Sequence, residues 1–138
     1  MFYNLLTLIL GLLVYQQSDE LKIKEPWIRP GAKDMSTAFY FIVENQSDKP
    51  DTLYKVSSEL AGKVEIHETY MKDDMMGMRE VEQIVIPPKS EFHFKPRAHH
   101  VMLMKLKNDL KNGDTGKIKL YFKSAGEYEL SVQVKSPK

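Results

Sequence analysis

Apolar and polar residues alternate along most of the chain after residue 20, with the two-residue period of strands that bury one face. The clearest alternation lies near the C-terminus, where apolar residues occupy every second position: Ile118, Leu120 and Phe122, then Tyr128, Leu130, Val132 and Val134. Ser124, Ala125 and Gly126 between these runs have the composition of a turn. We therefore predict two antiparallel strands at residues 117–122 and 127–134.

Shorter runs rich in aromatic and β-branched residues predict more strands upstream. They lie at residues 21–24, 37–44, 52–56, 63–70, 79–86, 91–94 and 99–106. Polar turn clusters separate several of them, at residues 45–50 and 112–114, and a Pro-containing break follows residue 24. Short strands with frequent turns favour an all-β, antiparallel sandwich or barrel.

Residues 1–18 differ from the rest of the chain. The apolar run from Leu5 to Tyr15 has the length of a signal-peptide core and is too short to span a membrane comfortably. No Lys or Arg precedes it and no Ala-x-Ala cleavage site follows it, so a buried first strand or a short membrane anchor stays open. We predict a signal peptide or N-terminal anchor at residues 1–18 and one domain at residues 19–138.

The composition of the chain excludes several kinds of binding and catalytic site. The 138 residues are 42% hydrophobic and 28% charged with a net charge of +1, which is typical of one globular domain and gives no basic surface for nucleic acid. The sequence contains no cysteine. This excludes disulfides, a thiolate nucleophile, Cys-ligated zinc, a blue-copper site and a lipid-modified cysteine.

Soft metal donors are concentrated between residues 67 and 104. This window holds six of the eight methionines and all four histidines. Alternation in the predicted strand 99–106 places four residues on one face: His100, Met102, Met104 and Leu106. The opposite face carries His99, Val101, Leu103 and Lys105. His100 and Met102 can therefore converge on one ion, whereas His99 faces away and Met104 is expected to pack in the core.

Two further donors complete the candidate set. His67 shares a face with Glu65 and Thr69 in the predicted strand 63–70, and Met78 follows a polar, loop-like segment from residue 71. Imidazole and thioether donors together suit Cu(I) better than zinc, and they bind only when the imidazole is neutral, so affinity should fall in acid. Methionine is also a common core residue. Spacing and chemistry alone leave a metal site and simple packing both open.

Other catalytic motifs are absent or incomplete in the sequence. His67-Glu68-x-x-Met71 begins like the zinc-protease signature, but its second histidine is replaced and the segment reads as a strand. No Gly-x-Ser-x-Gly motif, phosphate loop or nucleotide fingerprint occurs.

The arrangement of these donors resembles a known family. Ten residues separate His67 from Met78, 21 separate Met78 from His100, and one separates His100 from Met102, as in the periplasmic PCuAC copper chaperones. Flanking words are similar too: Glu25–Pro30, Val64–Glu68, Met76–Arg79, Ile86–Pro88 and His100–Met104. The similarity extends from about residue 21 to residue 135.

This resemblance implies a cupredoxin-like, Greek-key β-sandwich with one principal Cu(I) site near the surface, whose ligands are His67, Met78, His100 and Met102. It implies a non-enzymatic, exported protein that delivers copper toward cytochrome c oxidase assembly, beside a Sco-type protein or the copper-site subunit of the oxidase. Contact with a membrane is expected only through an uncleaved leader. Met71, Met75 and Met76 are either auxiliary donors or part of a flexible, oxidisable loop.

Two other functions remain as alternatives. A copper storage or detoxification protein without a dedicated acceptor has the same sequence features as a chaperone. A redox enzyme or electron carrier is disfavoured, because cysteine is missing and thioethers favour Cu(I).

Overall fold

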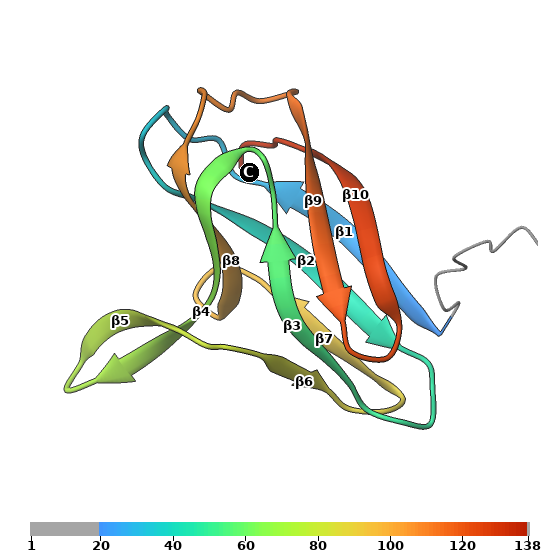
Figure 1. Cartoon of the computed structure of the whole chain (residues 1–138). Helices are drawn as coiled ribbons and strands as arrows, with labels where there is room; N and C mark the ends of the chain where they lie inside the picture. Colours follow the sequence, from blue (N-terminus) through green and yellow to red (C-terminus); the bar gives the residue numbers. More distant parts are fainter. Residues whose placement is uncertain (1–19, 138) are drawn as a thin grey trace, which may run out of the picture.

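The computed structural model describes residues 20–137, and the predicted leader at residues 1–18 lies outside them. Ten strands form two sheets packed face to face (Figure 1). The first five strands are β1 Leu21–Ile28, β2 Thr37–Asn45, β3 Asp51–Ser57, β4 Ala61–Lys72 and β5 Met75–Glu80. The last five are β6 Ile84–Ile86, β7 Ser90–Phe94, β8 His99–Leu106, β9 Thr115–Phe122 and β10 Gly126–Gln133. No helix of the described residues is long and apolar enough to cross a membrane.

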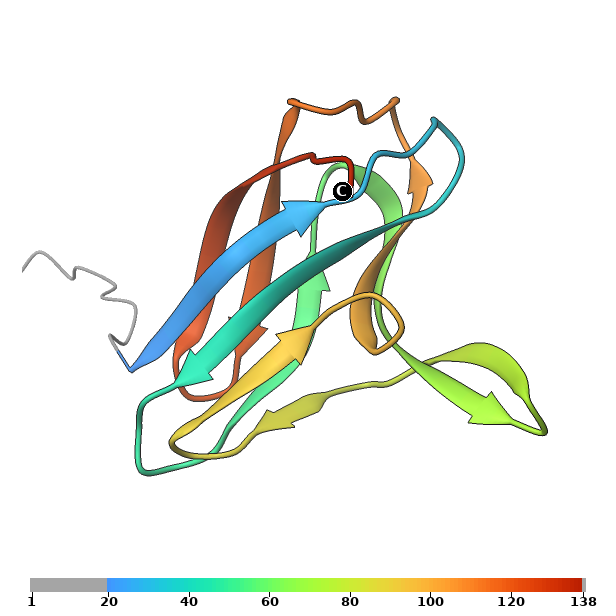
Figure 2. The same cartoon turned by 180° about the vertical axis from the view of Figure 1, so that it is seen from behind.

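The two sheets differ in size. The larger has the strand order β1-β2-β7-β8-β4-β5 and the smaller the order β10-β9-β3-β6. Strand pairs are antiparallel except β7 with β8, and a parallel bridge from Ile28 to Val134 joins the sheets along one side. The chain passes between the sheets after β2, β3, β5, β6 and β8 (Figure 2). The prediction of an all-β, cupredoxin-like sandwich is confirmed.

The core lies between the inner faces of the sheets. It contains the alternating residues predicted from β9 and β10, including Ile118, Leu120 and Val132, at 0–1% exposure. Phe39 and Phe41 of β2 stack with each other, and Phe41 stacks on Phe94 of β7 with ring centres 4.2 Å apart. Burial of these apolar surfaces supplies most of the drive for folding.

Two predicted strand boundaries are wrong. β1 continues through Pro26 to Ile28, because a bulge with Glu25 at φ 50° accommodates the break and an edge strand tolerates proline. Residues 79–86 are not one strand: β5 pairs with β4 in the larger sheet, whereas β6 pairs with β3 in the smaller one. The composition of a strand does not show which of two sheets it joins.

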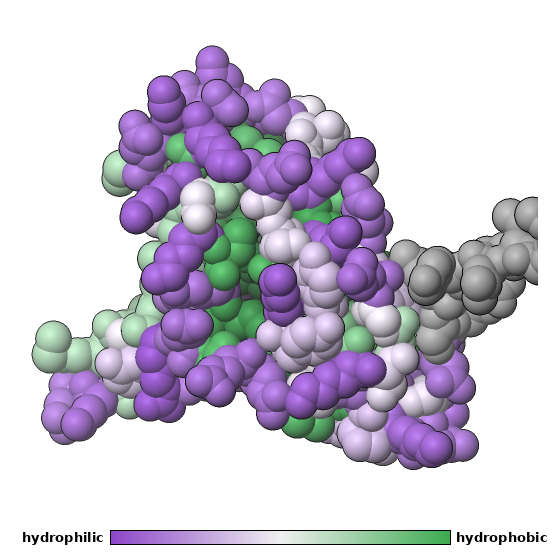
Figure 3. All heavy atoms as spheres, viewed as in Figure 1, coloured by the Kyte–Doolittle hydropathy of each residue, from purple (hydrophilic) through white to green (hydrophobic). Residues whose placement is uncertain are grey.

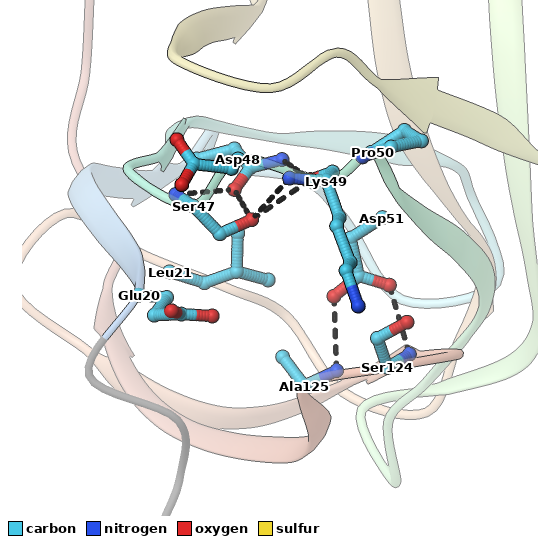
Figure 4. Close-up of a pocket in the computed structure, with 10 residues that line it drawn as sticks. Glu20, Leu21, Ser47, Asp48, Lys49, Pro50, Asp51, Ser124 and Ala125 are labelled. Atoms are coloured by element: carbon cyan, nitrogen blue, oxygen red, sulfur yellow. Dashed lines mark hydrogen bonds between the residues drawn. The ribbon is translucent and has the colours of Figure 1, made fainter.

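Polar side chains fasten one corner of the sandwich, where β2 ends and β3 begins (Figure 4). The Asp51 carboxylate accepts hydrogen bonds from the backbone N–H groups of Thr52, Ser124 and Ala125 at 2.8–2.9 Å. Asn45 donates its amide to the carbonyls of Lys49, Ile86 and Pro87, and its oxygen accepts from the N–H and hydroxyl of Ser47. We call Asn45 and Asp51 the anchored corner.

Candidate metal centre

The pairing of β4 with β8 brings the two candidate histidines together. His67 lies directly opposite His100, and Glu65 lies opposite Met102. Side chains of directly opposed residues project from the same face of a sheet. The alternate residues Ile66, Val101 and Leu103 are buried in the core. The donors therefore occupy the outer face of the larger sheet. The sequence pattern predicts that His100 and Met102 share a face, but not that this face is the outer one.

Met78 reaches the same face from the neighbouring strand. In the β4–β5 hairpin, Met78 lies opposite Thr69, and Thr69 is two residues from His67 on the same side of β4. Met78 is 58% exposed, whereas His100 is only 4% exposed. The four predicted ligands thus share one face, with His100 at its buried end and Met78 at its exposed end.

A groove of about 450 Å³ opens beside these residues. Its lining includes Met76, Met78, His100 and Met102, together with Tyr40 from β2. The groove leads from bulk solvent to the otherwise buried His100 ring. An ion or a small chelator can therefore approach the site without unfolding of the sandwich.

Glu65 fixes the orientation of the His67 ring. Its carboxylate Oε2 lies 2.7 Å from His67 Nε2, and its other oxygen pairs with the Lys63 ammonium. The Lys63 ammonium, and then the hydrogen bond with His67, lower the pKa of Glu65, so this group is an ionised acceptor. A carboxylate cannot donate, so Nε2 carries a proton, and in the neutral form of the ring the lone pair is on Nδ1.

A backbone carbonyl fixes the opposite tautomer in His100, with the proton on Nδ1. His100 Nδ1 donates to the Ala98 carbonyl oxygen at 3.1 Å, which leaves Nε2 with the lone pair. Burial lowers the pKa of His100, outweighing the carbonyl hydrogen bond that raises it. A neutral imidazole is the form that binds metals.

The two free lone pairs have no hydrogen-bond partner. Of the buried side-chain nitrogen and oxygen atoms in residues 20–137, His67 Nδ1 and His100 Nε2 are the two that are unpaired. The ring centres are 5.8 Å apart. A metal bound about 2.1 Å from a ring nitrogen lies roughly 3 Å from that ring's centre, so a separation of 5.8 Å between the ring centres is the spacing expected for two imidazoles that share one ion.

Oxygen-rich metal sites are not part of this face. Within the described stretch, no three His, Cys, Asp or Glu side chains gather in an arrangement that holds a metal. The donors that do gather are two imidazoles and the thioethers of Met78 and Met102. This mixture matches a soft ion.

The remaining histidines lie elsewhere. His99 projects to the opposite face from His100, beside Glu68 and edge-on to Phe92. His93 is exposed and hydrogen bonds to Glu91. Neither joins the outer-face cluster.

The predicted positions of Met104 and Leu106 are wrong. Leu106 is 1% exposed in the core, and Met104 is half-buried on the outer face. The reason is Lys105, whose φ of 55° marks an irregularity that shifts the alternation by one residue. The pair Gly62 and Lys105 is missing from the ladder here, between Lys63 with Met104 and Ala61 with Leu106, and the register on either side is unchanged.

The segment of residues 71–78 is also more regular than predicted. Only Asp73 and Asp74 form the turn, with φ values of 51° and 61° that are typical of a two-residue hairpin turn. Strands β4 and β5 include all of the methionines from Met71 to Met78. The hairpin projects beyond the body of the sandwich (Figure 1).

Sequence reasoning assigned no role to Glu65 and the Ala98 carbonyl. Alternation already puts Glu65 on the face of His67, which was the available signal. The Ala98 carbonyl is positioned by a tight turn in which Ala98 N–H donates to Lys95, and the sequence shows no marker for that.

Solved structures with the same fold identify its class. The chain superposes on the apo PCuAC domain from PmoF1 with a TM-score of 0.73 and 28% identity, over 86% of this chain and 95% of that one. The copper-bound PCuAC domain from PmoF2 matches at 0.72 and 28%, over 86% and 94% of the two chains. The Cu(I) form of DR1885 from Deinococcus radiodurans matches at 0.65 and 28%, over 86% and 82%. Fold and outer face together define a PCuAC-type β-sandwich.

Sequence comparison gives the family. The family described as "Putative lipoprotein LpqE-like" matches residues 21–134. An uncharacterized Rickettsia prowazekii protein, RP573, is 32% identical over 130 residues, covering 86% of this chain and 72% of that protein. The chain belongs to the LpqE-like family, which is related to the PCuAC domains.

Proposed function

We propose that this chain binds one Cu(I) ion on the outer face of its larger sheet. The ligands are His67 Nδ1, His100 Nε2 and the thioether sulfurs of Met78 and Met102. The observation that carries the proposal is the pair of buried, unpaired imidazole nitrogens at adjacent positions. Buried polar atoms normally have partners, so two unpaired imidazole nitrogens on directly opposed residues point to a shared ligand.

The donor chemistry selects the ion. Two neutral imidazoles and two thioethers favour a soft monovalent ion over zinc or magnesium. Copper-bound relatives with 28% identity and the same fold support this choice. The ion is cargo rather than a catalytic cofactor, and we assign the protein no enzymatic activity.

The exposure of the site suits a carrier. Met78 is 58% exposed and the groove is open, so an incoming acceptor ligand can reach the ion without a large rearrangement. By its resemblance to the PCuAC chaperones, the protein delivers copper outside the cytoplasm toward cytochrome c oxidase assembly. A Sco-type protein or the copper-site subunit of the oxidase is the proposed acceptor. The lipoprotein description of its family supports an extracytoplasmic location.

Anaerobic competition with a chromophoric Cu(I) chelator tests the ligand set. The wild type should bind one equivalent of Cu(I) tightly. His67→Ala, His100→Ala and Met102→Leu should each lower the Cu(I) affinity by more than about 100-fold, which is more than the loss expected when only a residue that hydrogen bonds to a ligand is removed. Met78→Leu should weaken it less, because that donor is exposed. His93→Ala is the matched control and should leave affinity unchanged. Wild-type affinity in the His67→Ala and His100→Ala variants would sink the assignment.

A transfer experiment separates a carrier from a storage protein. Loaded protein is mixed with a Sco-type acceptor or the isolated copper domain of the oxidase, and the copper on each is measured after separation. Rapid transfer is expected. Retention of copper, despite a higher affinity of the acceptor, would favour storage.

A further inference from the structure

The β4–β5 hairpin has two unlike faces. Register places Met71 directly opposite Met76, and Thr69 opposite Met78. Since alternate residues share a face, Met71, Met76 and Met78 lie on the side of the sheet that carries His67 and His100. We call these three residues the methionine face. Met75 lies opposite Lys72 and projects from the other side.

The reverse side of the hairpin is packed. The Tyr70 ring covers Gly77 so closely that a Cβ there would lie 2.6 Å from Tyr70 Cζ. The Arg79 guanidinium lies 4.9 Å from the centre of the same ring and pairs with Glu68. These contacts, with the two-residue turn at Asp73 and Asp74, hold the hairpin as a regular ribbon.

The methionines on both sides of the hairpin are exposed, and Met75 on the reverse side is 73% exposed. Met71, Met76 and Met78 are 63%, 58% and 58% exposed. Figure 3 shows pale green, apolar residues on this projection, apart from the body of the molecule. Exposed methionines forgo the burial that makes this residue useful in cores, so packing does not explain them.

The methionine face is continuous with the proposed copper site. Met76 and Met78 line the same groove as His100 and Met102. Directly opposed residues such as Met71 and Met76 have Cβ atoms only about 5 Å apart, which allows both sulfurs to reach one ion. The chain therefore presents thioethers in a row from the tip of the hairpin to the buried histidines.

We propose that Met71, Met76 and Met78 form a second, weaker binding site for a soft monovalent cation, through which Cu(I) enters and leaves the histidine site. We call each of the two binding sites a station. The proposal rests on the function proposed above. Thioethers bind Cu(I) without a proton or a charge, and imidazoles add stronger donors, so affinity rises toward His100. Met78 belongs to both stations and remains bound while the other donors exchange. Copper stays Cu(I) throughout, so the step needs no electron donor or acceptor.

Titration of the full chain with Ag(I), a soft ion that does not change oxidation state, tests the station directly. With methyl-labelled methionine, the Met78 and Met102 resonances should shift during the first equivalent. The Met71 and Met76 resonances should shift during the second, while Met75 stays unchanged. Unchanged Met71 and Met76 resonances at two equivalents would overturn the proposal.

Matched variants supply the second test. Met71→Leu combined with Met76→Leu should keep the first Cu(I) equivalent at wild-type affinity, weaken the second by about tenfold or more, and slow copper release to a small chelator. Met75→Leu, on the reverse side of the same hairpin, should match the wild type in all three. An equal loss in Met75→Leu would overturn the proposal. Slower transfer to a protein acceptor, with unchanged binding and release to the chelator, would identify a docking surface instead and also overturn it.

The two proposals fail in different ways. If His100→Ala retains the first equivalent, the histidine ligand set is wrong. The Met71 and Met76 resonances still report on the hairpin in that variant: a shift with Ag(I) supports the station, and no shift overturns it.

Discussion

Buried polar atoms near the two ends of β2 differ in whether they are hydrogen bonded. At the Asn45 end, the anchored corner, the carboxylate of Asp51 and the amide of Asn45 are hydrogen bonded to backbone from three loops. At the Thr37 end, which borders the groove, two histidines keep a buried nitrogen unpaired. Buried polar groups need hydrogen-bond partners in both regions, but only at the anchored corner does the chain itself supply them.

The difference separates stability from function. A buried polar group with all its partners stabilises the fold, whereas an unpaired one costs free energy until something binds it. Burial alone therefore does not mark a functional site. The unpaired lone pairs of His67 and His100, next to exposed thioethers, do so here.

Removing the Asp51 carboxylate should give a large loss of stability. Asp51→Ala leaves three backbone N–H groups without their charged acceptor, so the free energy of unfolding should fall by about 3 kcal/mol or more. Urea denaturation of the copper-free protein measures this. Cu(I) affinity, measured by chelator competition under native conditions, should not change.

Asp48→Ala is the control at the same corner, because that side chain is 91% exposed. It should leave both stability and affinity near wild type. A large loss of Cu(I) affinity in Asp51→Ala would show that the two ends of β2 are not independent.

Glu65→Leu should lower the Cu(I) affinity and leave the stability of the fold largely unchanged, the opposite of Asp51→Ala. His67 loses the carboxylate that holds its Nε2 proton, so Cu(I) affinity should fall by roughly 10- to 100-fold while the fold persists. Glu65→Gln retains an acceptor for Nε2–H and should recover part of the loss. Imidazole ¹⁵N shifts should report a mixture of His67 tautomers in Glu65→Leu alone.

Lys63→Met is the matched control for charge. It removes the ammonium that pairs with Glu65 but leaves the hydrogen bond to His67. If this variant loses as much affinity as Glu65→Leu, Glu65 acts through its charge and does not position the ring.

Mild acid should weaken the copper-free fold through His100. Burial lowers the pKa of His100 in the folded protein below its unfolded value near 6.5, so the unfolded state binds more protons. Stability is therefore full above that value and falls as pH decreases through it toward the folded pKa. Urea denaturation at pH 7.5 and 5.5 should show a smaller decrease in His100→Gln than in the wild type.

This pH window avoids the perturbed carboxylates. Neighbouring cations lower the pKa values of Glu44, Glu65, Glu68 and Glu91 from 4.5, so these groups remain ionised down to pH 5.5. His93→Gln serves as the exposed control. An equal decrease in His100→Gln and wild type would show that His100 does not contribute.

Local patterns predicted the strands well where one face is simply buried. Period-two alternation identified the inner faces of β9 and β10, and it placed His100 and Met102 on one face of their strand; the pairing of β4 with β8 adds His67 to that face. It failed at Lys105, because a positive φ at a lysine has no signature in the sequence. It also could not separate β5 from β6, since the choice of sheet depends on long-range pairing. The tautomers of the two histidines follow from Glu65 and from the Ala98 carbonyl, which only the folded backbone brings into place.

Met104 tests where the functional face ends, and the expected effect is small. It lies opposite Lys63 on the outer face, one alternate position beyond Met102, and is half-buried. Met104→Ala should therefore cost about 1 kcal/mol or less of stability, the usual effect outside the core. Leu103→Ala, at a fully buried neighbour, should cost about 2–5 kcal/mol. Cu(I) affinity should be unchanged in Met104→Ala, because His67, Met78, His100 and Met102 already supply four donors. A loss of affinity comparable to that of Met102→Leu would extend the site along β8 and require a fifth donor.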